Sequence, residues 1–376
     1  MMYSLKSGII LFNIKLKFMV ENRPFKILSI DGGGIKGLYS AMILKHFEEE
    51  FGHPIADYFD MICGTSTGGL IALALSLKVP AKDLVDFYYN DGSKIFNYKS
   101  SNGLYATIRQ TFFKGKYSDK NLKNALEKVL GGHTMSDSKT LLCIPSYNMT
   151  AGKPRIFKYP HEEGNFCMDR NISMVDVALA TSAAPTYFPV AVVDKELFVD
   201  GGVWANNPTL CGLLEATKHF INNGKTYKVK NTKKQYESER EVQFNSYQIL
   251  SIASISSNSG WSMTSKFSGF SFPKFRHRPF LLWRNKLFQT CLDGQSFFAD
   301  HFMQSIQDNI KTEGLYYRIP NPDLSREHLE DIDLDNASKG SLDLLYKIGD
   351  RTGFDYRAAQ KHNILPFFQS FKNYQI

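Results

Sequence analysis

The sequence lacks the features that mark several classes of protein. No apolar run reaches the roughly 18 residues of a membrane span, and no internal repeat or low-complexity tract is present. Charged residues make up 22% of the 376 residues and hydrophobic residues 43%, which excludes wholesale disorder, a collagen and a multi-span membrane protein. The chain is long enough to bury one large core or two modest ones.

Paired cysteines are also missing. The five cysteines form no C-x-x-C pair, and an odd number suits reduced thiols better than a disulfide framework. We therefore expect a reducing, cytoplasmic location.

Acidic residues are absent from two stretches, 1–20 and 242–292, although the whole chain has a formal charge of +8. Between Trp261 and Phe288 the cations alternate with aromatic residues. Three interpretations remain open: a packed aromatic segment with a solvated basic face, docking to an anionic membrane surface, or nucleotide binding.

We expect three parts in the chain: a leader over 1–23, a catalytic core over 24–215 and a C-terminal continuation over 216–376. The continuation would complete the fold and regulate it or contact a membrane. The leader is interpreted as frayed, or as an upstream start before Met19. A signal peptide is disfavoured because two lysines follow its short apolar run and no small-x-small cleavage site comes after.

Strands and helices alternate along the chain, which is typical of an α/β protein. The first four elements predict a parallel sheet with helices on both faces. Residues 81–131 are predicted to be mainly helical and 225–241 a loop. The other expected strands are 25–30, 58–63, 141–147, 155–159, 197–199 and 248–255, and the other expected helices are 35–51, 70–77, 174–180, 212–220, 297–310 and 341–349.

The motif Gly64-Thr65-Ser66-Thr67-Gly68 lies between a predicted strand and a predicted helix. Such a turn holds a serine toward a substrate, and small residues two positions before and after it allow the tight turn. The helix that follows directs the positive end of its dipole at the site. A chance turn of small residues is the alternative, but the context favours Ser66 as a nucleophile.

A second glycine-rich turn, Asp31–Gly37, follows the first predicted strand. Its glycines also satisfy the G-x-G-x-x-G pattern of dinucleotide-binding proteins, but the next strand ends in Ile62-Cys63-Gly64 instead of a ribose-binding acid. Consecutive glycine N–H groups at a helix start form an anion-binding nest. We therefore favour an oxyanion hole, with donors from Gly32, Gly33 and Gly34.

A third motif, Asp200-Gly201-Gly202, follows a predicted strand, although an Asp-Gly pair alone indicates only a turn. The three motifs, in this order, resemble those of the patatin-like phospholipases. That family combines a D-G-G-G-x-[RK]-G loop, a G-x-S-x-G turn and a downstream D-G-[GA]. The resemblance covers about residues 24–215 and includes the run from Ala183 to Pro189.

The resemblance implies a three-layer α/β/α sandwich with a central, mostly parallel sheet. It also implies hydrolysis of acyl esters by a Ser–Asp dyad without histidine, metal or required cofactor. Ser66 would be the nucleophile and Asp200 the base. Lys36 stands where many members have arginine, which is also cationic. The remaining motif residues are Asp31, Lys36, Gly37, Gly64, Gly68, Gly201 and Gly202.

The mechanism implied is acyl transfer. Asp200 accepts the proton of Ser66, the serine attacks the ester carbonyl, the glycine turn stabilises the oxyanion, and a water activated by Asp200 hydrolyses the acyl-enzyme. A Ser–His–Asp triad is the competing interpretation. Its histidine would be His161, His219 or His301, none of which lies in a recognisable triad context.

The first eighty-odd residues, including 25–30 and 55–60, are similar to bacterial patatin-like effectors of anti-phage cyclic-oligonucleotide signalling. That resemblance implies an enzyme that degrades membrane phospholipids at the inner membrane once a cyclic dinucleotide binds. It implies no nucleic-acid partner, and a homodimer or higher oligomer is left open. Two other hypotheses are a non-catalytic nucleotide- or lipid-sensing module on this fold and an NAD-type dehydrogenase, for which no acidic ribose partner is found.

Overall fold

The structure, a computed structural model, describes residues 20–96, 116–161, 167–229, 240–255, 264–267, 270–273, 280–309, 313–322 and 324–372. The strands of the main sheet are β1 Val20–Ile30, β2 Met61–Gly64, β3 Leu141–Asn148, β4 Lys153–Lys158, β5 Ala191–Val193, β6 Glu196–Asp200, β7 Tyr227–Val229, β8 Arg240–Ile252 and β11 Leu315–Ile319. A separate antiparallel pair consists of β9 Thr264–Phe267 and β10 Phe270–Pro273.

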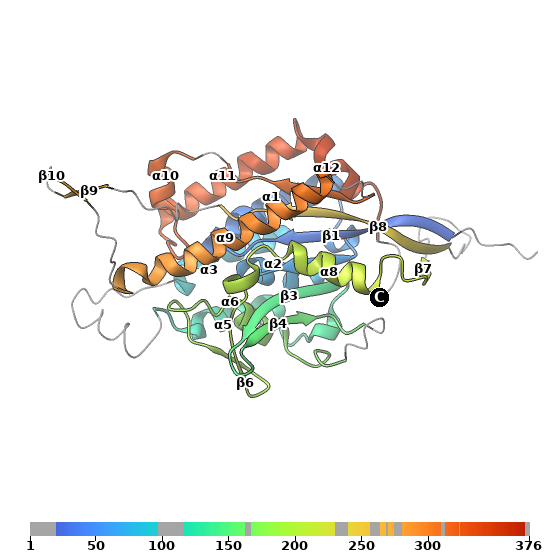
Figure 1. Ribbon diagram of the computed structural model, residues 1–376, viewed down its shortest axis with the longest axis horizontal. Coiled ribbons are helices and arrows are strands. Elements are labelled where there is room, and N and C mark those ends of the chain that lie inside the picture. Colours follow the sequence, from blue (N-terminus) through green and yellow to red (C-terminus); the bar gives the residue numbers. More distant parts are fainter. Residues whose placement is uncertain are drawn as a thin grey trace, which may run out of the picture.

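Helices connect and cover these strands (Figure 1). The α-helices are α1 Gly37–Phe51, α2 Thr67–Ser76, α3 Ala81–Ile95, α5 Asp119–Leu130, α6 Met174–Ser182, α7 Gly202–Ala205, α8 Thr209–His219, α9 Phe280–Asn309, α10 Arg326–Asp331, α11 Lys339–Arg357 and α12 Lys361–Phe368. Short 3-10 turns are η1 Gly34–Lys36, η2 Ile55–Asp57 and η3 Met135–Asp137.

The strand order is β11-β8-β1-β2-β3-β6-β5, with β4 paired to β3 and β7 paired to β8. The five strands from β11 to β3 are mutually parallel, whereas the pairs that involve β4, β5, β6 and β7 are antiparallel. Ile30 of β1 lies beside Gly64 of β2. Both glycine-rich turns therefore leave the same edge of the sheet, at the carboxyl ends of neighbouring parallel strands, where α/β proteins place their sites.

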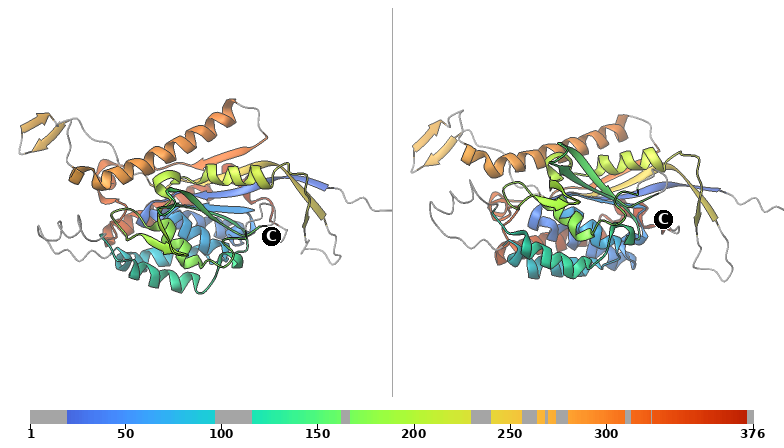
Figure 2. Two further views of the ribbon diagram at one scale, coloured as in Figure 1. Left: turned by 60° about the horizontal axis from the view of Figure 1, so that its bottom comes forward. Right: turned by 90° about the horizontal axis from the view of Figure 1, so that it is seen from below.

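Side chains along β1 alternate between two apolar layers. Leu28 and Ile30 join the core beneath α1, α2, α3, α6, α11 and α12, whereas Phe25 and Ile27 join a second core beneath α8. All four side chains are fully buried, as expected for a strand covered on both faces. Figure 2 shows α8 and α9 on one side of the sheet and the α1, α3 and α5 layer on the other. The predicted α/β/α sandwich with a mostly parallel centre is confirmed.

The structure corrects several predicted boundaries. β1 begins at Val20, so residues 20–23 of the predicted leader belong to a strand, and β2 begins at Met61 instead of residue 58 because η2 precedes it. The predicted loop 225–241 contains β7 and the first residues of β8. The part of that loop from 230 to 239, like residues 1–19, lies outside the described residues.

The largest correction concerns α9, a 30-residue helix where 297–310 is predicted. Its buried side chains are spaced as on one helix face. The exposed Phe297 and Phe298 hide this pattern in the sequence because apolar residues then occur on both faces. Buried positions along the helix include Phe288, Leu292, Ala299 and Met303.

The basic, aromatic stretch 261–288 contributes the β9–β10 pair and the start of α9. Most of its side chains lie outside the described residues, so its three interpretations stay predictions. Among the helices of the described ranges, none combines the length and apolar character that crossing a bilayer takes.

Candidate active site

Ser66 occupies a strained turn between β2 and α2. Its φ of 53° and ψ of −124° are unusual for a residue with a side chain, and such strain is typical of functional sites. A Cβ on Gly64 would lie 2.1 Å from the Gly68 carbonyl oxygen, and a Cβ on Gly68 would lie 2.3 Å from the Ile30 carbonyl oxygen. Both flanking positions therefore require glycine, as the motif predicts.

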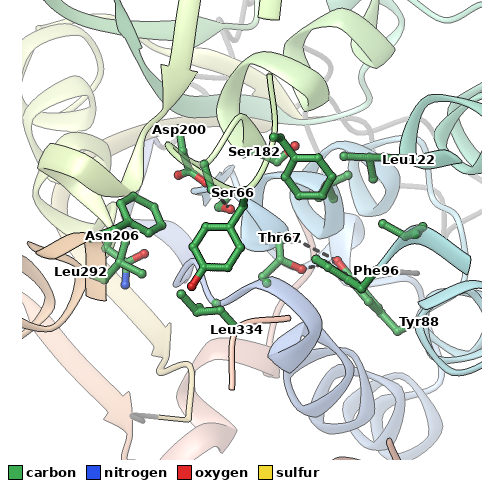
Figure 3. Close-up of a pocket in the computed structure, with 18 of the residues that line it drawn as sticks. Ser66, Thr67, Tyr88, Phe96, Leu122, Ser182, Asp200, Asn206, Leu292 and Leu334 are labelled. Atoms are coloured by element: carbon green, nitrogen blue, oxygen red, sulfur yellow. Dashed lines mark hydrogen bonds between the residues drawn. The ribbon is translucent and has the colours of Figure 1, made fainter. Parts of the chain in front are cut away.

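Asp200 lies directly against this serine. The Ser66 hydroxyl donates to Asp200 Oδ2 at 2.7 Å, and the Gly202 N–H donates to Asp200 Oδ1 at the same distance. The aspartate reaches the site at the end of β6, whose antiparallel pairing with β3 places Asp200 beside Ser146. Figure 3 shows its carboxyl group facing the serine.

Burial changes the acidity of this aspartate. The side chain is almost fully enclosed, and loss of solvation raises the pKa of Asp200 to about 7, although the hydrogen bonds from Ser66 and Gly202 oppose the rise. A carboxylate with such a pKa is a better proton acceptor than an exposed aspartate. The pair therefore has both the contact and the basicity that proton transfer from a serine needs.

The glycine turn supplies fewer free donors than the sequence predicts. The Gly32 N–H donates to the Asn206 carbonyl at 3.1 Å, so it is not available to an oxyanion in this conformation. Among the described residues, none accepts a hydrogen bond from the N–H of Gly33 or Gly34. The N–H of Thr67, the first residue of α2, is likewise free of a described partner, which agrees with the prediction that the start of this helix is directed at the site.

The backbone geometry of the glycine turn excludes larger residues. Gly34 has a φ of +60°, and a Cβ there would lie 2.1 Å from the Leu334 carbonyl oxygen. That carbonyl accepts a hydrogen bond from the Ile35 N–H at 2.9 Å, which fixes the turn against the segment before α11. The position of the oxyanion donors thus depends on the contact with Leu334, which lies about 300 residues further along the chain.

Arg318 on β11 is a site residue that sequence reasoning missed. Its guanidinium donates to both oxygens of the buried Asp31 carboxylate, at 3.2 and 2.5 Å. Such two-point pairing fixes direction as well as distance. This ion pair joins Asp31, the first residue of the glycine turn, to β11. No motif in the sequence around Arg318 predicts the pairing.

The remaining motif residues lie around the same turns. Lys36 is only 2% exposed, and burial lowers the pKa of its ammonium to about 8 even though Asp293 and Asp333 oppose the change. A Cβ on Gly37 would lie 2.2 Å from Thr67 Oγ1, and one on Gly201 would lie 2.2 Å from a carbonyl oxygen of β3. These glycines allow close packing around the site.

A narrow apolar hollow opens on Ser66 (Figure 3). It has about 50 Å³ of free space. Tyr88 and Phe96 lie on one side of the serine in Figure 3, and Asn206 and Leu292 lie on the other. The hydrophobic lining residues are Leu70, Phe87, Tyr88, Ile95, Phe96, Leu122, Ala184, Tyr187, Phe188, Phe288, Leu292 and Leu334. The lining suits a hydrocarbon chain.

None of the three histidines considered for a triad lines this hollow within the described part of the chain. His161 is buried on the α8 side of the sheet and its ring nitrogen contacts Glu215 at 2.9 Å, beside His219. His301 lies on α9 and stacks on Phe297. The described ranges also contain no group of three or more His, Cys, Asp or Glu side chains arranged to hold a metal ion.

Comparison with known proteins assigns the chain to a family. The family model described as "Patatin-like phospholipase" matches residues 28–210. Relatives at 30% identity or more cover most of the chain as well. The chain therefore belongs to the patatin-like phospholipase family and is a lipid acyl hydrolase.

The relatives come from bacteria and plants. A "cGAMP-activated phospholipase" of Pseudomonas aeruginosa is 32% identical over 354 residues, which is 93% of this chain and 92% of the relative. A protein of that description from Vibrio cholerae is 32% identical over 343 residues, 86% of this chain and 89% of the relative. "Patatin-like protein 1" of Arabidopsis thaliana is 30% identical over 360 residues, 86% of this chain and 80% of the relative.

Proposed function

We propose that this enzyme cleaves the acyl esters of membrane phospholipids with a dyad of Ser66 and Asp200. The observation that supports it most directly is the 2.7 Å hydrogen bond from the strained serine to a buried carboxyl group whose pKa is about 7. Asp200 accepts the serine proton as the serine attacks and donates it to the alcohol of the lysophospholipid as that group departs. The regenerated carboxylate then takes a proton from the water that attacks the acyl-enzyme, and returns it to Ser66 as the fatty acid is released.

The oxyanion donors in this proposal are the N–H groups of Gly33 and Gly34, joined by that of Thr67 at the start of α2. Gly32 is not one of these donors, because its N–H is bonded to the Asn206 carbonyl. Its role in this proposal is only to leave that position without a side chain. Since a carboxylate is a weak base toward a hydroxyl, stabilisation of the oxyanion must supply much of the rate. The reaction requires no cofactor or metal.

We further propose that a cyclic dinucleotide activates the enzyme, in the cytoplasm at the inner face of a bacterial membrane, as part of anti-phage defence. Two bacterial relatives are described as cGAMP-activated. The hollow at Ser66 supports a latent state, since about 50 Å³ accommodates only a few water molecules at roughly 10–15 Å³ of free space each. A fatty-acyl chain needs the hollow to open.

Labelling with a fluorophosphonate probe tests the nucleophile, and mass spectrometry locates the adduct. Ser66 is expected to carry the label, and Ser66→Ala is the control. An adduct on another residue, or none under any condition, would favour the non-catalytic sensing module.

Lipid-product analysis with and without a panel of cyclic dinucleotides tests activation. We expect weak release of fatty acid from the protein alone and strong release with one of the nucleotides. Full activity without any nucleotide, unchanged across the panel, would refute the activation proposal while leaving the dyad intact.

A further inference from the structure

A second cavity lies beside the Ser66 hollow and is polar where the first is apolar. It holds about 360 Å³, and Asn206 and Leu292 line both spaces. Gly32 lines it too, and a Cβ on that glycine would lie 3.1 Å from Ser66 Cβ. The cavity therefore begins next to the reacting serine, on the Asn206 and Leu292 side seen in Figure 3.

Four buried oxygen atoms in this cavity have no hydrogen-bond partner among the described residues. Three of them accept hydrogen bonds and donate none, namely Oδ1 of Asn206, Oε1 of Gln289 and Oδ2 of Asp293, whereas the fourth, the hydroxyl of Ser254, can also donate. Asn206 and Gln289 are 5% and 6% exposed. The Gln289 amide donates to Asp293 Oδ1 at 2.8 Å, so α9 holds two of the free acceptors side by side.

Unsatisfied acceptors at such positions are costly, at about 1–3 kcal/mol for each buried group. Proteins therefore rarely leave several of them in one place. The presence of three unsatisfied acceptors in one cavity next to a nucleophile indicates that the cavity receives a group rich in N–H donors.

The charges in the cavity narrow the chemistry of that group. Asp31 and Arg318 neutralise each other through their two-point pair. Asp300 lies beside the same arginine, with its Oδ2 3.9 Å from Arg318 Nε. Asp293 lies near the buried Lys36, which makes no hydrogen bond or ion pair with any described residue. The lining thus has the carboxylates of Asp31, Asp293 and Asp300 against the cations Lys36 and Arg318. The excess of one negative charge disfavours a purely anionic ligand, and separated positive and negative groups favour a zwitterion.

We propose that this cavity binds the head group of the phospholipid and selects a zwitterionic head group that carries a primary ammonium. The ammonium donates to Asp293 and Gln289, while the phosphodiester lies toward Lys36. The inference rests on the proposed phospholipase function. Gln289 and Asp293 lie outside residues 28–210, so the family match assigns them no role.

Three head groups should be distinguished by this arrangement. An ethanolamine head group offers three N–H donors and a positive charge to the free acceptors. A choline head group brings the charge without a donor, and a glycerol head group is anionic overall. The expected order of kcat/KM is therefore ethanolamine, then choline, then glycerol.

The assay uses dihexanoyl phospholipids below their critical micelle concentrations, with the full-length protein and any activating nucleotide that it requires. Monomeric lipids remove the effect of vesicle charge on a basic protein. Each rate is divided by the rate on p-nitrophenyl butyrate, an ester without a head group, which corrects for variants that alter folding or the dyad. We expect the ethanolamine lipid to exceed the glycerol lipid at least about tenfold, the factor associated with roughly one charge-assisted hydrogen bond.

Two variants probe the acceptors, and a third serves as a matched control. Asp293→Asn and Gln289→Leu should each lower the ethanolamine-to-glycerol ratio, the former about tenfold. Asp308→Asn removes an exposed carboxylate from the same helix, away from the cavity, and should keep the ratio.

Equal rates for all three head groups, preference for the glycerol lipid, or an unchanged ratio in both variants would overturn the head-group proposal. Loss of the nucleotide response in Asp293→Asn with an unchanged ratio would also overturn it, and would assign the cavity to the activator. Absence of hydrolysis for every phospholipid would instead refute the proposed function.

Discussion

Replacing Asp200 with asparagine should abolish hydrolysis and, at the same time, stabilise the protein in a pH-dependent way. Burial raises the pKa of this carboxyl from 3.8 to about 7 in the folded protein. The folded state therefore holds the proton more tightly than the unfolded state. The resulting stability is fully present below pH 3.8 and is lost as the pH rises toward 7.

The magnitude follows from the size of the shift. At 1.36 kcal/mol per pH unit, the ionised Asp200 costs about 4 kcal/mol at pH 8, of which about 2.5 kcal/mol accumulates between pH 5 and pH 8. Asparagine keeps an acceptor for the Gly202 N–H and has no charge to bury. The stability advantage of Asp200→Asn over the wild type should therefore grow by about 2.5 kcal/mol over that interval.

Urea unfolding of both proteins at pH 5 and pH 8 measures this difference. Ser66→Ala is the control, because it is equally inactive but keeps the buried carboxyl group, so its stability should fall with pH as the wild type does. An advantage for Asp200→Asn that is equal at the two pH values would refute the argument that burial sets the basicity of Asp200.

Further predictions concern the dyad, the glycine turn and its support. Hydrolysis of a soluble ester should rise with pH through a midpoint near 7, since Asp200 must lose its proton to accept another, and a flat profile would contradict this. Gly34→Ala should reduce kcat about a hundredfold or more by displacing oxyanion donors, whereas Gly132→Ala, where an added Cβ meets nothing within 4 Å, should keep full activity. Arg318→Ala should lower the free energy of unfolding by about 3–5 kcal/mol in urea titrations, because it leaves a buried carboxylate unpaired, and a loss below about 1 kcal/mol would contradict that role.

The sequence predicts well the parts of the fold that are local. The first two strands, the turns that follow them and the helices after those turns are specified by short runs of residues. Glycine is required at position 64 because a Cβ there would collide with the Gly68 carbonyl oxygen of the same turn. It is required at position 68 because a Cβ there would collide with the Ile30 carbonyl oxygen of the neighbouring strand β1. The parallel order of β1 and β2 then brings both motifs to one edge.

Features that depend on distant parts of the chain could not be predicted in the same way. The Gly32 N–H is taken by Asn206, which lies far along the chain, so the glycine pattern alone overstates the number of oxyanion donors. Arg318 has no motif around it. The length of α9 is hidden because Phe297 and Phe298 point outward, at 73% and 60% exposure, and so break the amphipathic pattern.

The catalytic motifs are therefore not a self-contained site. β8 pairs with β1 from Val20 to Ile30, and the Asp31 N–H donates to the Ile252 carbonyl at the end of β8. The glycine turn is further held by Arg318 and by the carbonyl of Leu334, and α9 supplies side chains to the walls of both cavities. The residues after 215 thus determine where the oxyanion donors lie and which part of a lipid can approach them. Because these contacts adjoin Ser66 on one side and a polar cavity on the other, a shift of α9 would change acyl-chain access and head-group contacts together.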